Sequence, residues 1–317
     1  MEQQLTGIHH VTAITGDPQR TLDFYSEVLG LRLVKRTVNF DDPGTYHFYF
    51  GNERGEPGTL LTFFPWLGAR RGRIGTGQVT ATALSIPETA IAYWTARLAA
   101  LGVDVRDPED RFEETFIAIN DPDGLAIELV GRPDDDDRAP WPSSPVEPRY
   151  AIRGCDSVTV SGRRCEPMQE LLDELGFRLV GESGDRLRYV IGDGRSGTRL
   201  DLLCESDPTP GLVAVGTVHH VAWRTPDAEG QAAWRRRLAT LGLDVTRILD
   251  RGYFRSIYFR EPGGVLFEIA TDGPGFLIDE TADELGLHLK LPGWLEPRRS
   301  EVERVLPEIE LARARKG

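Results

Sequence analysis

The chain is poor in cysteine and has no long hydrophobic run. Its 317 residues include three cysteines, Cys155, Cys165 and Cys204, whose spacing fits neither a metal site nor a disulfide framework, so we expect a reducing compartment. No apolar run approaches the roughly 20 residues that cross a bilayer, and the first residues show no basic region followed by an apolar stretch. We therefore expect a cytoplasmic protein with no membrane partner.

Positive charge is scarce as well. Lysines and arginines total 37 against 50 aspartates and glutamates, which gives a formal net charge of -13. Binding to a nucleic-acid backbone depends on clustered basic side chains, so this balance argues against a nucleic-acid partner. The length allows two domains with a sizeable core.

What the chain does contain is a fourfold repeat. Amphipathic stretches end in Leu-Gly at Gly30, Gly102, Gly176 and Gly242, and a glycine after a periodic run is the usual signal for the end of a helix. Each predicted helix follows a β-rich run and precedes about three strand-like runs. This repeat of about 70 residues predicts an α+β fold of four βαβββ modules.

Composition also suggests where the domains end. Residues 132–149 are rich in proline and aspartate, which is typical of a linker. We predict an N-terminal domain at 1–131 with modules one and two, a C-terminal domain at 150–272 with modules three and four, and a tail at 273–317. The tail is expected to contain a helix over 298–314, and it either packs on the surface or closes over the site.

Two histidine pairs are the strongest chemical signal. His9 and His10 recur as His219 and His220, and Glu268 follows 48 residues after the last of them. Two histidines and one carboxylate on separate strands suit a ferrous site with open coordination positions. Because successive strand residues face opposite sides, we expect one histidine of each pair to line the cavity. Register alone does not choose between them.

Inherited packing is the alternative explanation for the repeated histidines. Modules two and three, however, begin near 79–82 and 156–159 without any histidine. Retention in modules one and four favours a site shared by these two, so modules one and four should pair with each other, and modules two and three likewise. Glu128 and Asp201, at the register of Glu268, would mark a second cleft and are expected to be structural.

Several segments carry a resemblance to a known superfamily. They are IHHVT at 8–12, FYSEVLG at 24–30, YHFYFG at 46–51, PGTLLTFFPW at 57–66, GVLFE at 264–268 and LPGWLEPRR at 291–299. Together they resemble the vicinal oxygen chelate superfamily of glyoxalases, bleomycin-resistance proteins and extradiol dioxygenases, and within it the hydroquinone-type ring-cleaving dioxygenases. The resemblance implies two tandem domains of this kind, whose mixed β-sheets curl into clefts with the helices outside.

The resemblance also implies the ligands and the metal. In such enzymes the second histidine of each pair binds the metal, which gives His10, His220 and Glu268, with Fe(II) as the expected cofactor and Mn(II) as the alternative. Thr62 occupies the position of Glu268 in module one, so the second carboxylate typical of a glyoxalase-type site is missing there. A three-ligand site favours iron and oxygen chemistry over Zn or Ni isomerase chemistry.

Three side chains beside the ligands are candidates for supporting roles. By resemblance, His9 and His219 flank the substrate or the metal, although a histidine bonded to the backbone is an equally ordinary outcome. Thr12 follows His10 by two residues on the same strand face, where it would support the ligands.

Two more candidates precede Glu268 in module four. By resemblance, Tyr258 and Arg251 would hydrogen-bond a substrate oxygen or superoxide. The alternative is a tyrosine that caps the sheet and an arginine in a surface ion pair. His47, in module one, is expected to be structural.

The predicted function is Fe(II)-dependent ring cleavage that inserts both atoms of O2 into a hydroquinone-type or related dihydroxylated aromatic. The alternatives are a glyoxalase-like metal-dependent lyase or isomerase, and a metal-free binding protein of the drug-resistance kind. The set of two histidines and one glutamate counts against the binding protein. We expect a small aromatic molecule and O2 as partners, and a homo-oligomer is compatible with the sequence.

Overall fold

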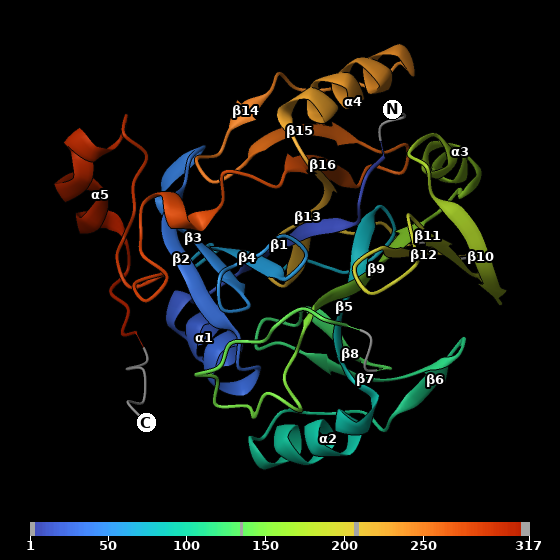
Figure 1. Cartoon of the computed structure of the whole chain (residues 1–317), viewed down its shortest axis with the longest axis horizontal. Helices are drawn as coiled ribbons and strands as arrows, with labels where there is room; N and C mark the ends of the chain where they lie inside the picture. The colour runs from blue at the N-terminus through green and yellow to red at the C-terminus, as the bar shows by residue number, and fades with distance from the viewer. Residues whose placement is uncertain (1–3, 134–135, 206–208, 312–317) are drawn as a thin grey trace.

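The strands of the described residues form two eight-stranded mixed sheets (Figure 1). A computed structural model describes residues 4–133, 136–205 and 209–311. Within them, the order of one strand, a helical segment and three strands occurs four times. The predicted α+β fold of four βαβββ modules is therefore confirmed.

Modules one and two come first in the chain. Module one comprises β1 (Ile8–Thr15), α1 (Pro18–Asp23) with its π-helical continuation η1 (Phe24–Val28), β2 (Arg32–Asn39), β3 (Asp42–Gly51) and β4 (Leu60–Pro65). Module two comprises β5 (Gln78–Pro87), η2 (Glu88–Ala90), α2 (Ile91–Ala100), β6 (Glu109–Arg111), β7 (Glu114–Asn120) and β8 (Ala126–Arg132).

Modules three and four follow, and then the tail. Module three comprises β9 (Gly154–Gly162), α3 (Glu166–Glu174), β10 (Arg178–Ser183), β11 (Arg186–Val190) and β12 (Arg199–Cys204). Module four comprises β13 (Thr217–Thr225), α4 (Ala228–Thr240), β14 (Leu249–Asp250), β15 (Arg255–Arg260) and β16 (Leu266–Thr271). The tail contains η3 (Phe276–Ile278), η4 (Glu296–Arg298) and α5 (Arg299–Val305).

The repeated glycines lie just past the helices, as predicted. Gly30, Gly102, Gly176 and Gly242 have φ angles of 73°, 74°, 87° and 83°, a left-handed conformation that costs glycine little. The helices α2, α3 and α4 lie at the periphery of the molecule, outside the sheets (Figure 1). Among the described residues, no helix has the length and the apolar character needed to cross a membrane.

Modules far apart in sequence share each sheet. The first sheet has the order β14-β15-β16-β13-β1-β4-β3-β2, so it joins module four to module one through β13 and β1. The second has the order β10-β11-β12-β9-β5-β8-β7-β6 and joins modules three and two through β9 and β5. Both junctions are antiparallel. The predicted pairing of the modules is confirmed.

Two β-bulges interrupt the junction of β1 with β13. One leaves His9 as an extra residue directly before the paired His10, and the other leaves His219 as an extra residue directly before the paired His220. A bulge bends its strand and changes the direction of nearby side chains. Both histidine pairs therefore lie at local departures from regular strand geometry.

In the second sheet, arginine side chains bind the two carboxylates that stand at the positions equivalent to Glu268. Glu128 accepts hydrogen bonds from Arg111 at 2.9 and 2.5 Å, and Asp201 accepts them from Arg188 at 2.7 and 2.9 Å. Paired charges are the usual condition for burying carboxylates. These contacts agree with the structural role expected for Glu128 and Asp201.

The prediction for the cysteines was wrong. Cys165 and Cys204 form a disulfide with their Cα atoms 5.9 Å apart, while Cys155 is buried and unpaired within the described chain. Cys204 on β12 lies opposite Gly162 on the neighbouring strand β9. Cys165 follows Gly162 by three residues, at the start of α3, and so comes close to Cys204. Sequence spacing cannot reveal this approach, so the cysteines no longer support a reducing compartment.

The tail helix is shorter than predicted. α5 ends at Val305, and Leu306 is extended, because a residue before proline avoids the helical conformation and Pro307 follows. Residues 312–314 of the predicted helix lie outside the described residues. The described tail packs on β2, where the buried Lys35 donates a hydrogen bond to Asp279 at 2.7 Å.

We expect the buried ion pair of Asp156 to govern stability in acid. Burial by itself would raise the pKa of Asp156, but two hydrogen bonds from Arg132, both 2.7 Å, hold this pKa at about 2. The unfolded value is about 3.9. The pair's stabilisation is therefore fully present above about pH 4 and is lost as the pH falls through about 2.

Asp156→Asn should lower the free energy of unfolding at pH 7 by about 3 kcal/mol, because it removes two charge-assisted hydrogen bonds from the buried Arg132 guanidinium, which keeps only Glu114 as a partner within the described chain. The variant should also lose less stability than the wild type between pH 4 and pH 2.5. Urea unfolding at each pH measures both effects. Glu147→Gln is the control, since the pair of Glu147 with Arg149 is exposed and worth below about 1 kcal/mol; equal losses in the two variants would contradict this assignment.

Candidate metal centre

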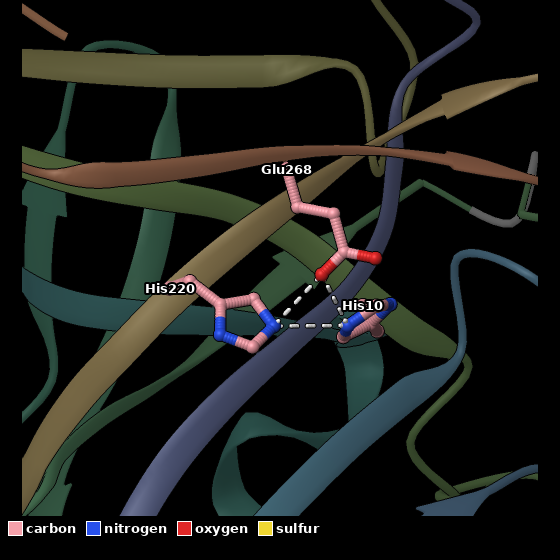
Figure 2. A group of neighbouring side chains, drawn as sticks. All are labelled: His10, His220 and Glu268. Atoms are coloured by element: carbon pink, nitrogen blue, oxygen red, sulfur yellow. Dashed lines mark hydrogen bonds and ion pairs between the residues drawn. The ribbon is translucent and has the colours of Figure 1, made fainter. Parts of the chain in front are cut away.

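Three buried side chains from three neighbouring strands meet in the first sheet. His10 lies on β1, His220 on β13 and Glu268 on β16, and Figure 2 shows their ends pointing toward one another. Nε2 of His10 lies 3.2 Å from Nε2 of His220. Oε2 of Glu268 lies 3.0 Å from Nε2 of His220 and 3.5 Å from Nε2 of His10.

These distances fit a shared metal ion. Two metal–ligand bonds of about 2.1 Å at angles of 90–110° place the ligand atoms about 3.0–3.4 Å apart. Oε2 of Glu268 is buried and accepts no hydrogen bond from the described residues, while the other carboxylate oxygen accepts one from Ser256 at 2.5 Å. The three side chains therefore present a converging set of donor atoms.

The charge states also suit ligands. Burial lowers the pKa of His220, which favours the neutral imidazole that a metal requires. Burial alone would raise the pKa of Glu268, but the adjacent His10 and His220 hold this pKa well below its usual range. Glu268 is therefore an anion at neutral pH.

The first histidine of each pair contacts the second through the ring nitrogens. Nδ1 of His9 lies 2.9 Å from Nδ1 of His10, and Nδ1 of His219 lies 2.7 Å from Nδ1 of His220. Such a contact fixes the orientation of a ligand ring and leaves its Nε2 for the metal. Burial lowers the pKa of His9 well below its usual value, and burial together with His220 lowers that of His219 to about 3.

A cavity of about 320 Å³ opens beside these ligands, within the size range of small-molecule sites. His219 and His220 both border it, so the expectation that only one of them would do so was wrong. The bulge at His219 accounts for this, because it breaks the alternation of faces along β13. Among the described residues of the tail, none borders this cavity.

Arg251 and Tyr258 form the wall on the β15 side of the cavity. Arg251 donates a hydrogen bond to Oη of Tyr258 at 3.2 Å and another to Asp41 at 3.0 Å. Burial and the nearby Glu268 raise the pKa of Tyr258, so its hydroxyl stays protonated. A fixed guanidinium and a phenol thus face the cavity together, as expected for groups that bind an oxygen with developing negative charge.

Thr12 lies on β1, two residues after His10. It pairs with His220 across the β1–β13 junction, and its hydroxyl is 2.7 Å from the hydroxyl of Thr62. Thr62 lies opposite Thr12, the second residue after His10. In the same way, Glu268 lies opposite the second residue after His220. The structure thus supports the equivalence of Thr62 and Glu268, and module one offers no carboxylate at this position.

The sequence did not identify two polar residues of the opposite wall. His47, expected to be structural, borders the cavity, and so does Tyr49. They alternate along β3 and so share a face. This period-two pattern was visible in the sequence, but only the sheet order shows which face of β3 meets the cavity.

Comparisons with known proteins agree with this fold. The profile of the Glyoxalase/Bleomycin resistance protein/Dioxygenase superfamily matches residues 7–129 and 171–269. The chain belongs to this superfamily. The match covers module one, module two, most of module three and module four, and it confirms the family that the sequence motifs suggested.

Full-length members of the superfamily are similar to this chain. MhqO of Bacillus subtilis (strain 168), provisionally named a ring-cleaving dioxygenase, is 47% identical over 315 residues, which are 98% of this chain and 99% of that protein. Chlorohydroquinone/hydroquinone 1,2-dioxygenase of Sphingobium indicum is 36% identical over 313 residues, 96% of this chain and 97% of that protein. A crystal structure of a provisionally named dioxygenase from B. subtilis superposes with a TM-score of 0.93 at 46% identity, covering 98% of this chain and 99% of that one.

Metal retention tests the ligand set. Glu268→Gln should lower the iron that the protein keeps after anaerobic loading and desalting at least about tenfold, because a neutral amide replaces an anionic ligand. Glu128→Gln, at the matching position of the second sheet, should keep wild-type iron. Metal analysis with circular dichroism as the folding check measures both, and undiminished iron in Glu268→Gln would contradict the assignment.

Proposed function

We propose that this protein is an Fe(II)-dependent ring-cleaving dioxygenase that inserts both atoms of O2 into a hydroquinone-type or related dihydroxylated aromatic. The observation that carries the proposal is the buried triad of His10, His220 and Glu268 at the edge of a cavity of about 320 Å³. The names of the full-length relatives support the same chemistry.

The three side chains would hold the metal by Nε2 of His10, Nε2 of His220 and Oε2 of Glu268. When bound, Fe(II) supplies open coordination positions at which a ring oxygen and dioxygen can meet and exchange electrons. Iron is favoured over Mn(II) by the proposed oxygen chemistry. Mn(II) remains the alternative, since the same ligand types accept it.

The wall residues would orient the ring and stabilise charge. Arg251 is held by Asp41 and Tyr258, so its positive charge is in place before an oxygen becomes negative. His219 is neutral at pH 7, because burial and His220 lower its pKa to about 3. With Nδ1 engaged by His220, Nε2 of His219 is the nitrogen that can accept a proton. His9 and Thr12 would act as positioning residues.

A glyoxalase-like lyase is the second candidate on this scaffold. Such a site resembles a four-ligand set with a second carboxylate, and here Thr62 stands at that position, with its hydroxyl bonded to Thr12 and His47. A metal-free binding protein would have no use for three converging buried donors. Both candidates are therefore less consistent with the site than a dioxygenase.

Oxygen uptake by anaerobically iron-loaded protein tests the function. Hydroquinone should consume one O2 per ring opened, with little consumption for catechol, and the ring-opened product can be followed by absorbance. Removal of iron with a chelator should abolish uptake and Fe(II) should restore it, whereas equal restoration by Mn(II) would assign manganese. Stoichiometric bound iron without uptake for either ring would refute the reaction.

A further inference from the structure

Tyr49 and His47 line the cavity from module one, whereas Arg251 lines it from module four. Both lie on β3, which β4 separates from β1. Two strand spacings put β3 about 10 Å from β1, the strand of His10. Both side chains border the same cavity as the proposed ligands His10 and His220. A ring held by the metal at one end can therefore direct its other end toward them.

A chain of hydrogen bonds fixes these two residues. Oη of Tyr49 lies 2.9 Å from Nδ1 of His47, and Nε2 of His47 lies 3.0 Å from Oγ1 of Thr62. The rings of His47 and Tyr49 pack with their centroids 4.0 Å apart. The chain continues to Thr12 at 2.7 Å, so the wall is anchored to the strand that carries His10.

This series of hydrogen bonds leaves the hydroxyl of Tyr49 able to bind a further oxygen. Burial lowers the pKa of His47 well below its usual value and raises that of Tyr49 well above, so the imidazole is neutral and the phenol keeps its proton. If Tyr49 donates to Nδ1, its oxygen can still accept a hydrogen bond. If Nδ1 donates instead, the phenol proton is free for another acceptor. Either arrangement suits a hydroxyl group.

Several other polar side chains of the cavity are already engaged. Arg251 binds Asp41 and Tyr258, the side-chain oxygen of Asn39 accepts from the backbone N–H of Asp41, and the hydroxyl of Thr246 accepts from the backbone N–H of Tyr258. Tyr49, backed by His47, lines the same cavity from β3 and can meet the far end of a bound ring.

We propose that Tyr49, held in place by His47, binds the ring oxygen that does not bind the metal, and so selects para-diols over ortho-diols. In a para-diol the second oxygen lies at the opposite end of the ring, on the side of β3. In an ortho-diol both oxygens lie on one edge, beside the metal. The proposal rests on the proposed function, because it takes an aromatic diol as the ligand.

Anaerobic calorimetry on the Fe(II)-loaded protein tests this proposal by comparing hydroquinone with phenol, which lacks the second oxygen. The wild type should bind hydroquinone about tenfold more tightly than phenol, the effect of one hydrogen bond, and Tyr49→Phe should reduce this ratio to about one. Tyr46→Phe is the matched control on the opposite face of β3, where its hydroxyl bonds the carbonyl of Pro307. A wild-type ratio that Tyr49→Phe leaves unchanged would overturn the proposal.

The part of His47 is tested by a double-variant cycle. His47→Leu should also lower the ratio, and the double variant with Tyr49→Phe should lose no more than Tyr49→Phe alone, because His47 acts through Tyr49. Additive losses would assign His47 a separate contact and overturn its positioning role. Oxygen uptake decides the reaction independently: uptake with hydroquinone but no discrimination against phenol defeats the Tyr49 proposal alone, while absent uptake defeats the proposed function.

Discussion

The candidate site depends on the antiparallel junction of β1 with β13. This junction brings together His10 and His220, which are 210 residues apart in the chain, and β16 adds Glu268 from the other side of β13. Three donor atoms within 3.5 Å of one another require the strands to keep their register. A slip by one residue would turn the ligands to the other face of the sheet.

The two bulges in this junction change the orientation of the first histidine of each pair. A regular strand would turn His9 and His219 away from the cavity, whereas the bulges let each contact its neighbouring ligand through Nδ1. The sheet therefore supplies both the ligands and the groups that orient them. The duplicated modules keep this arrangement in the second sheet, where the β5–β9 junction also has two register shifts.

Each sheet buries a carboxylate at the same position, but the positive partner of that carboxylate differs between the two sheets. In the second, the buried Asp201 is neutralised by Arg186 and Arg188, so no charge is left for a cation. In the first, the carboxylate oxygens of Glu268 contact two histidines and a serine, and no arginine pairs with them among the described residues. An anion buried without a guanidinium needs another positive partner, and a metal ion meets that need.

Local patterns in the sequence were enough to predict the modules and their helix ends, whereas the choice of His10 and His220 within the two pairs came from the family resemblance. Glycines such as Gly30 act through their own backbone, and the repeat itself showed that only modules one and four keep histidines. Tertiary structure alone decided the bulges, the disulfide between Cys165 and Cys204, and the wall formed by His47 and Tyr49. These depend on which strands pair and in what register, and pairings between distant strands leave no periodic signal in either segment.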